Sequence, residues 1–554
     1  MLNRRHFLKT VGAGMAAANV PVKVLASRTQ ESTGYFGLHQ FIEDHPEAVF
    51  IMKTNAADKY DTDAKLAAGL SFGRSVFVPK DESSGMPLTT TIPVKGNLKT
   101  ANPDSYDHDL IMSHTIDAIF TEGVFEGLKE LGIQGSQIYL REVNRPDIYK
   151  REPYGFEAMC NRTGTDLRLD MAPKVTSLTE GADYNWIDVP DGVFYSKIPY
   201  LEPINTPDSW LLNISKFKAH GMGLTLCCKN LQGSIVHNYQ AFCTAYNRTM
   251  DMLSSHRQPD AKQHIQTIFQ EHLEAGVPRW DRPGSDFNSG IGMETWVQRT
   301  LDNLSVTPAG LHIIEGIYGR DGQGNNDRGP NPQDVDHNCN DYGVSETGKA
   351  WDWMSNVIIF GRDSFRVDII GFWLGGHEPG NVGLFHSAIS RGMLDVIDPS
   401  KIPVYIWEDG TATQVSLDSL ERTNLLTYYL RRNYLPGEDE PAYHLLDEPF
   451  NYGTVTGVNE PDLPAKPQAF VLSQNHPNPF NPSTAIEYAL PEGGNVLLEV
   501  FNSAGQRVSV LANGYRGAGS HMATWNTSGQ ASGVYFYRLR FGGFSETRKM
   551  TLMR

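Results

Sequence analysis

The sequence predicts an α/β domain with a largely parallel sheet, followed by a C-terminal all-β sandwich. Between residues 49 and 409, stretches with apolar residues at helical spacing alternate with short apolar runs. Helices interleaved with buried parallel strands give this pattern. From residue 470 onward, apolar and polar residues alternate with a period of two between glycine-containing turns, which is typical of antiparallel strands. The Pro-rich stretch Pro461 to Pro467 is the expected linker between the two parts.

Individual elements follow from the same periodicities. Apolar residues recur at intervals of three and four over 112–128, 265–273, 293–301 and 365–373, which predicts helices there. Asp363 precedes the last of these and is placed to cap it. Apolar runs at 137–140, 210–214, 311–317, 356–360 and 404–407 predict strands.

The C-terminal part is predicted to have one apolar face on each strand. Ile486, Tyr488 and Leu490 alternate along one run. In the last hairpin Val534, Tyr537 and Leu539 are apolar, and whether Tyr535 or Phe536 joins them on the inner face stays open. Alternate residues of a strand point to opposite faces, so these runs predict a small antiparallel sandwich.

Composition excludes some functions. The chain has 554 residues and a net charge of −16, which argues against a nucleic-acid binder, because such a protein needs a clustered positive face. Its five cysteines, an odd number at irregular spacings, form no zinc pattern and no iron–sulfur ligand run. We expect buried free thiols, although a Cys160–Cys243 bridge stays possible in an oxidising compartment.

The amino terminus carries an export pattern. Arg4-Arg5 precede an apolar stretch rich in Ala and Gly, from Val11 to Val20, and small residues end at Ala26. This arrangement resembles a Tat signal peptide, which implies the Tat translocase as a partner and the periplasm as a first destination. The stretch is too short for a membrane anchor, so we expect a soluble mature protein. The expected division is 1–26 signal, 27–455 α/β domain, 456–469 linker and 470–554 sandwich.

Polar residues crowd the end of the strand predicted at 210–214. Ser215, Lys216, Lys218 and His220 follow one another there, and alternate residues share a strand face. Gly221 and Gly223 are then expected to open a short helix that carries Lys229 and Asn230. In an open parallel sheet the crevice beyond the carboxyl ends of the strands binds ligands, and amides at a helix start favour anions. The alternative is that the lysines are solvated and His220 caps a turn.

Two further segments carry candidate residues. Lys95 and Asn97 lie at another strand end, where a plain surface turn is the alternative. Glu315 begins a glycine-rich loop that runs to Pro330, and its Asp and Asn residues do not match a calcium-binding order. Asp368, like Asp363, is a candidate for orienting one of the cations.

Read together, these segments resemble the domain of unknown function 362 family, from about Val49 to about Met393. The resemblance rests on Lys95-x-Asn97, on Lys216-x-Lys218-x-His220 with Lys229-Asn230, on Glu315-Gly316, and on Asp363 with Asp368. It implies a fold and a pocket but no substrate. Many relatives carry an inserted ferredoxin-like Cys cluster, which this chain lacks, so we expect no iron–sulfur cluster and leave the cofactor unknown.

The C-terminal part resembles a type A sorting domain of the type IX secretion system. The motifs are Asn478-Pro-Phe-Asn-Pro482 at its start and Arg548-Lys549-Met550 near its end. The resemblance implies an immunoglobulin-like fold, the secretion machinery as a partner, and delivery to the cell surface or the medium.

Two functions are compatible with these residues. In the first, the α/β domain is an enzyme-like domain for a small anionic ligand, with His220, Lys218 and Lys229 as catalytic residues. Its ligand-binding residues would be Lys95, Asn97, Lys216, Gly221, Gly223, Asn230, Glu315 and Asp368. His220 would carry the proton near neutral pH, and a lysine crowded by cations would have a depressed pKa. In the second, the same residues capture a ligand or a metal compound without catalysis. No nucleic acid and no tightly held metal are expected.

Overall fold

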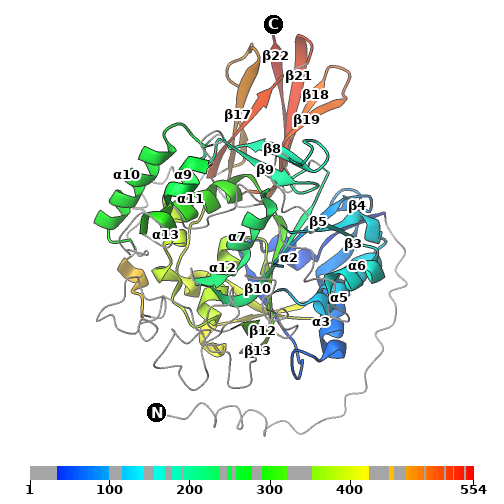
Figure 1. The fold of residues 1–554 in the computed structure, drawn as a ribbon. Coiled ribbons are helices and arrows are strands. Elements are labelled where there is room, and N and C mark those ends of the chain that lie inside the picture. Colours follow the sequence, from blue (N-terminus) through cyan, green and yellow to red (C-terminus); the bar gives the residue numbers. More distant parts are fainter. Residues whose placement is uncertain are drawn as a thin grey trace.

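The computed structural model describes most of the chain in two parts, an α/β domain and a C-terminal β-sandwich that projects from one end of it (Figure 1). The described residues are 34–98, 115–142, 155–168, 177–189, 191–206, 208–220, 223–236, 246–252, 257–277, 290–307, 309–320, 352–422, 448–454, 469–491, 494–516, 519–527, 530–541 and 544–553.

The α/β domain is built on one mixed, mainly parallel sheet. Its strand order is β15-β14-β2-β13-β12-β10-β5-β6-β7, with β11 added to β10. Strand β13 is antiparallel to both neighbours and β15 is antiparallel to β14, while the other pairs along the path are parallel. The bounds are β2 Val49–Lys53, β5 Ile92–Gly96, β6 Ile138–Arg141, β7 Asp166–Arg168, β10 Leu211–His220, β11 Gly223–Thr225, β12 Ala309–Arg320, β13 Asp352–Gly361, β14 Val404–Glu408 and β15 Thr411–Val415. The predicted largely parallel α/β sheet is confirmed.

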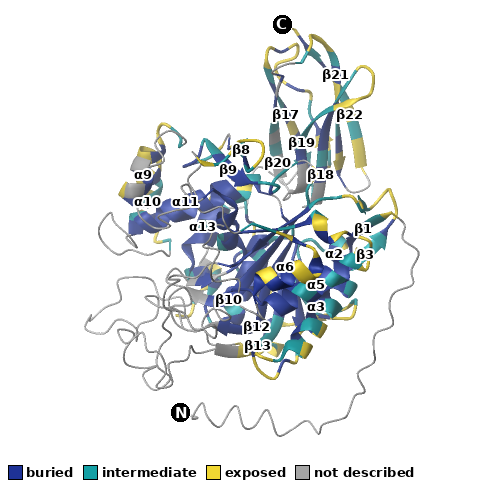
Figure 2. Ribbon diagram, turned by 45° about the vertical axis from the view of Figure 1, so that its right-hand side comes forward, coloured by how far each residue is buried: buried dark blue, intermediate teal, exposed yellow. Residues whose placement is uncertain are grey.

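Helices cover both faces of this sheet, and its central strands are buried between them (Figure 2). One face carries α3 (Thr62–Val76), α5 (Ala118–Lys129) and α6 (Phe156–Thr163). The other carries α7 (Cys227–Asn230), α11 (Gly290–Val306), α12 (Ser364–Leu374) and α13 (Gly383–Ser390). Strands buried on both faces read as continuous apolar runs, which is why the sequence indicated parallel strands.

Helices α3 and α5 pack unusually closely because glycines face each other. A Cβ atom on Gly69 would lie 2.1 Å from the carbonyl oxygen of Phe120, and one on Gly127 would lie 2.7 Å from the Cα of Gly73. Larger side chains at these positions would push the helices apart. This close packing brings the amino-terminal parts of both helices to the sheet edge that is described below.

The predicted helices form, with ends set by their caps. Helix α12 begins after Asp363, whose carboxylate accepts from the N–H groups of Phe365 and Arg366, so the predicted cap is confirmed. Helix α5 begins at Ala118, later than predicted, because the carboxylate of Asp117 accepts from the N–H groups of Ile119 and Phe120 and ends the preceding loop. The start of the predicted 112–128 helix, up to residue 114, lies outside the described residues.

Smaller elements complete the α/β domain. Strands β1 (Tyr35–Leu38), β3 (Phe77–Lys80) and β4 (Met86–Pro87) form a separate sheet, and α2 (Gln40–Asp44) follows β1. Strands β8 (Tyr184–Asp188) and β9 (Lys197–Leu201) pair and share a third apolar cluster with α9 (Tyr246–Met252) and α10 (Ala261–Glu274).

The C-terminal part consists of two antiparallel sheets around a common core. Their orders are β16-β17-β20 and β19-β18-β21-β22. The bounds are β16 Val471–Leu472, β17 Ser483–Leu490, β18 Gly494–Asn502, β19 Arg507–Arg516, β20 Gly519–Asn526, β21 Gly533–Phe541 and β22 Phe544–Leu552. In β21, Tyr535 joins Tyr537 and Leu539 in the core while Phe536 is exposed, which decides the alternative that the sequence left open.

Among the described cysteines, Cys160, Cys227 and Cys228 are buried free thiols. Cys243 and Cys339 lie outside the described residues. Within the described ranges, none of the helices has the length and apolar character needed to cross a membrane.

Candidate ligand-binding site

Lys95 and Asn97 lie at the carboxyl end of β5, whereas Lys216 and Glu315 lie in the middle of β10 and β12, on the other face of the sheet. Asn213 is opposite Lys95 in the β5–β10 pair, and Lys216 is opposite Glu315 in the β10–β12 pair. Residues 213 and 216 are an odd number of positions apart, so their side chains point to opposite faces. The expectation of one shared pocket for Lys95 and Lys216 is therefore wrong. We call the two groups the Asn230 cluster (Lys95, Asn97, Glu142, Asn213, Asn230) and the Lys216 cluster (Lys65, Asp117, Lys216, Glu315, Tyr318).

Lys95 is held by three oxygens in the Asn230 cluster. Its Nζ lies 2.6 Å from the carbonyl oxygen of Gly96, 2.7 Å from Glu142 Oε2 and 3.0 Å from Asn230 Oδ1. An ammonium group has three N–H donors, so these contacts occupy all of them. The carboxylate of Glu142 supplies the compensating charge in a site where both residues are buried. Lys95 is a positioning residue in this arrangement.

The side-chain amide of Asn230 has an orientation that its partners dictate. Its Nδ2 lies 3.0 Å from the carbonyl oxygen of Lys95, 2.8 Å from Asn213 Oδ1 and 2.9 Å from the carbonyl oxygen of Ile214. These atoms are acceptors, so the nitrogen of Asn230 must face them. Its oxygen then accepts from Lys95 and from Asn97 Nδ2, the latter at 3.3 Å.

The orientation of Asn230 fixes that of Asn97 in turn. Because Asn230 presents an oxygen, Asn97 must present its Nδ2, and its Oδ1 points elsewhere. That Oδ1 is buried and has no hydrogen-bond partner in the structure, and Asn97 as a whole is only 6% exposed. Buried acceptors are rarely left unpaired, so a donor from a ligand or a water molecule is expected at this point.

Asn213 is oriented by a buried histidine. Its Nδ2 lies 3.0 Å from the carbonyl oxygen of Cys227 and 3.0 Å from His312 Nδ1, which leaves its Oδ1 to accept from Asn230. Burial lowers the pKa of His312 to about 3, with a further contribution from Arg362. The neutral ring can accept a hydrogen bond at Nδ1. His312 therefore fixes the orientation of Asn213, which fixes that of Asn230, which in turn fixes that of Asn97.

Asp368 holds α7 against the sheet. Its carboxylate accepts from the N–H groups of Cys227 at 2.7 Å and Cys228 at 2.8 Å. Burial raises the pKa of Asp368 to about 7, against the effect of these hydrogen bonds. The expectation that Asp368 orients a cation is replaced by this backbone contact, through which it positions Asn230 at the end of α7. Asp363 caps α12 and pairs with Arg366.

The Lys216 cluster lies on the opposite face, against α3 and α5. Lys216 Nζ lies 2.7 Å from Glu315 Oε2 and 3.6 Å from the centre of the Tyr318 ring. Lys65 Nζ lies 2.7 Å from Asp117 Oδ2, which also accepts from the hydroxyl of Tyr318 at 2.8 Å. Each of these two lysines therefore has its own carboxylate.

The two carboxylates of this cluster have pKa values that are displaced in opposite directions. Burial raises the pKa of Glu315, although Lys216 opposes it. Burial also acts to raise the pKa of Asp117, but the ammonium groups of Lys65 and Lys216 and the N–H of Phe120 outweigh it and lower the pKa. The two residues are also in direct contact, because the backbone N–H of Asp117 donates a hydrogen bond of 3.0 Å to Glu315 Oε2.

The remaining described residues of the predicted site lie on β10, β11 and α7. Lys218 is buried and lies opposite Thr225, and His220 ends β10 opposite Gly223. Gly223 begins strand β11 and does not open a helix, because the chain returns as a hairpin before α7 starts at Cys227. Gly221 lies outside the described residues. Lys229 is half-buried in α7.

In the third predicted segment, which begins at Glu315, the strand extends further than the sequence predicted. Glu315 to Arg320 belong to β12, paired with β13 through an irregular register after Gly316. The rest of the predicted glycine-rich loop, from residue 321, lies outside the described residues.

Sequence reasoning missed Lys65, Asp117, Glu142 and Tyr318. Asp117 stands where a helix N-cap belongs, and Glu142 directly follows the strand predicted at 137–140, so both had a usable signal. Lys65 and Tyr318 had none, because only the close approach of α3 and β12 brings them together. Within the described residues, His, Cys, Asp and Glu form no group of three or more that could hold a metal ion.

These features define an α/β protein with a polar, buried cluster at the carboxyl ends of β5 and β6 in a mainly parallel sheet. Residues 94–372, half of the chain, match the family described as "Domain of unknown function (DUF362)", and the chain belongs to that family. Residues 475–553 match the "Secretion system C-terminal sorting domain", which implies export by the type IX secretion machinery to the cell surface or the extracellular space. No curated protein matches the chain.

Proposed function

We propose that the α/β domain is an enzyme for a small anionic ligand that also carries a hydroxyl or N–H donor. The single observation that carries the proposal is the buried, unpartnered Oδ1 of Asn97, in a cluster whose other amides have fixed orientations. A hydroxy acid or a sugar phosphate has the required combination of donor and negative charge. The carboxyl edge of the parallel strands is also where such ligands bind in open sheets.

The predicted residues take different roles in this proposal. Lys218 and His220, on the last part of β10, and Lys229, on α7, remain the candidates for charge neutralisation and proton transfer. Lys95, Asn230 and Asp368 position Asn97 and α7, and Lys216 with Glu315 fixes β10 against β12.

Native mass spectrometry of protein purified from its own host tests whether a ligand is bound at this site. We expect a retained small molecule on the wild type and its loss in Asn97→Leu, with Gln414→Leu, an exposed position on β15, as the matched control. Equal retention in both variants would contradict the site. Incubating the released compound with wild type and with His220→Ala then separates catalysis from capture, because only an enzyme alters the compound.

We propose further that export begins at the Tat translocase, which the Arg4-Arg5 pair supports. Replacing both with Lys should abolish delivery beyond the cytoplasm, measured by cell fractionation. An immunoglobulin-like relationship of the sorting domain is supported by its sheets of three and four antiparallel strands.

A further inference from the structure

The outer face of the four-stranded sheet in the sorting domain carries arginines and exposed aromatic rings. In β21, Tyr535, Tyr537 and Leu539 point into the core, so Phe536, Arg538 and Arg540 point outward. We define the Glu499 face as Glu499, Phe501, Arg507, Phe536, Arg538 and Arg540, from β18, β19 and β21. At the edge of this face Arg507 also contacts the α/β domain, with 3.7 Å between its Nη2 and Asp208 Oδ1. The six residues of the face belong to neither the Asn230 cluster nor the Lys216 cluster.

Glu499 is one carboxylate shared by three guanidinium groups. Its Oε1 lies 3.2 Å from Arg507 Nη1, and its Oε2 lies 3.1 Å from both Arg538 Nη2 and Arg540 Nη2. Glu499 is only 3% exposed, whereas the three arginines are 37–49% exposed. The carboxylate therefore lies beneath the arginines and holds them in place. Because Arg507 also pairs with Asp208, the positive charge left for a partner lies on Arg538 and Arg540.

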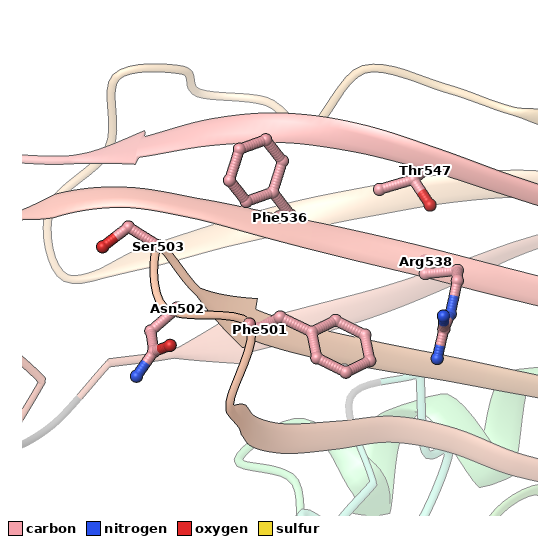
Figure 3. Close-up of a pocket in the computed structure, with 7 residues that line it drawn as sticks. Phe501, Asn502, Ser503, Phe536, Arg538 and Thr547 are labelled. Carbon is pink, nitrogen blue, oxygen red and sulfur yellow. The ribbon is translucent and has the colours of Figure 1, made fainter.

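A shallow hollow adjoins these arginines (Figure 3). It has a volume of about 320 Å³ and is lined by Phe501, Asn502, Ser503, Gly505, Phe536, Arg538 and Thr547. The guanidinium of Arg538 stacks 4.7 Å from the centre of the Phe501 ring, and its Nε is buried without a hydrogen-bond partner in the structure. Arginine and aromatic side chains around a hollow are the composition of binding hot spots between proteins.

The charge of this region differs in sign from that of the whole chain. Residues 470–554 contain seven Lys and Arg residues, four Glu and no Asp, whereas the chain has a net charge of −16. The terminal domain is thus a basic module on an acidic protein. Basic surfaces attract acidic partners and speed their association.

We propose that the Glu499 face is the surface by which the sorting domain docks on an acidic protein of the secretion machinery. Carboxylates of that partner bind the guanidinium donors of Arg538 and Arg540 that Glu499 leaves unused, and an apolar partner side chain fills the hollow beside Phe536. The proposal rests on the sorting domain's role in export and is independent of the ligand site.

The first test measures secretion of the full chain in its own host. In Arg538→Glu/Arg540→Glu we expect the secreted fraction to fall at least about tenfold, because charge reversal places like charges in the interface. The control Lys53→Glu/Lys401→Glu makes the same change in net charge at exposed positions of the α/β domain and should stay within about twofold of wild type. Normal secretion of the arginine variant would overturn the proposal.

A second variant separates docking from folding. Glu499→Gln keeps the arginines and adds positive charge, so its secretion should stay near wild type even where its melting temperature falls. A loss of secretion in Glu499→Gln as large as in the arginine variant would show that the three ion pairs serve only the fold, and would overturn the proposal.

A binding measurement on the purified full chain uses fluorescein-labelled poly-L-glutamate as the acidic protein probe. We expect salt-sensitive binding by wild type, at least about tenfold weaker binding by Arg538→Glu/Arg540→Glu, and no change in the Lys53→Glu/Lys401→Glu control. Equal binding by all three proteins would contradict the docking face. Binding of dextran sulfate with no binding of poly-L-glutamate would make the partner a polysaccharide and would also overturn the proposal.

Discussion

Asn230 and Lys95 bind each other through two reciprocal hydrogen bonds. Asn230 Nδ2 donates to the carbonyl oxygen of Lys95 at 3.0 Å, and Asn230 Oδ1 accepts from Lys95 Nζ at 3.0 Å. The pair ties α7 to the end of β5 and determines which atom Asn97 presents. The chemistry of the site therefore depends on an amide whose nitrogen and oxygen have distinct partners.

Replacing the side-chain amide nitrogen of Asn230 with oxygen should lower the stability of the fold. In Asn230→Asp, the backbone oxygens of Lys95 and Ile214 and the Oδ1 of Asn213 lose their donor and face a carboxylate. We expect a loss of about 2–4 kcal/mol in the free energy of unfolding, measured by urea denaturation. The control Gln414→Glu, on the exposed face of β15, should change it by less than about 0.5 kcal/mol. Equal stability of the two variants would mean that the amide network is not formed.

Lys216 and Glu315 should be coupled strongly, because both are fully buried. Lys216→Met leaves a buried carboxylate without its cation and should cost about 3–5 kcal/mol in unfolding free energy. Glu315→Gln in the same chain removes the unpaired charge and keeps an acceptor oxygen for one of the two N–H groups, of Asp117 and Ile317, that the carboxylate accepts. A double-mutant cycle should therefore show that the double variant is more stable than Lys216→Met alone; additive losses would argue against the ion pair.

Asp368 should make stability depend on pH. Its pKa rises from 3.8 to about 7 on burial, so the folded state binds a proton that the unfolded state releases. This contribution is fully present below about pH 4, declines as the pH rises, and is lost above about pH 7; its size is on the order of 4 kcal/mol. The thiols of Cys227 and Cys228 have raised pKa values and do not titrate in this range.

The pH effect is measured against Asp368→Asn, which cannot titrate. The stability advantage of the wild type over this variant should shrink between pH 4 and pH 7 and stay constant above. A difference that grows with pH would show that the hydrogen bonds from Cys227 and Cys228 outweigh burial.

Cys227 and Cys228 should resist alkylation in the folded protein. Burial raises the pKa of both thiols well above the usual value, with a further contribution from Asp368, so the reactive thiolate is scarce. We expect iodoacetamide to label them only after denaturation, as followed by peptide mapping. If iodoacetamide labelled these two cysteines in the folded protein as fast as it labels an exposed thiol, the packing of α7 on β10 would be contradicted.

The sequence allowed the prediction of the α/β class, of most strands and of the capped helix at Asp363, because periodicity and capping are local signals. It did not reveal which face of the sheet each lysine occupies. Lys95 and Lys216 looked equivalent as cations at strand ends, but the register of β5, β10 and β12 places them against different helices. Gly221 and Gly223 were expected to open a helix, but Gly223 is the first residue of β11, which pairs with β10.

The central claim is that the unpartnered oxygen of Asn97 receives a hydrogen bond from a bound ligand. A high-resolution crystal structure of protein isolated from its own host tests it most directly. We predict density for a small molecule with a hydroxyl or N–H group within hydrogen-bonding distance of Asn97 Oδ1, on the side of β5 that carries Asn230. A single water molecule bound to Asn97, with no other density at the ends of β5 and β10, would contradict the account.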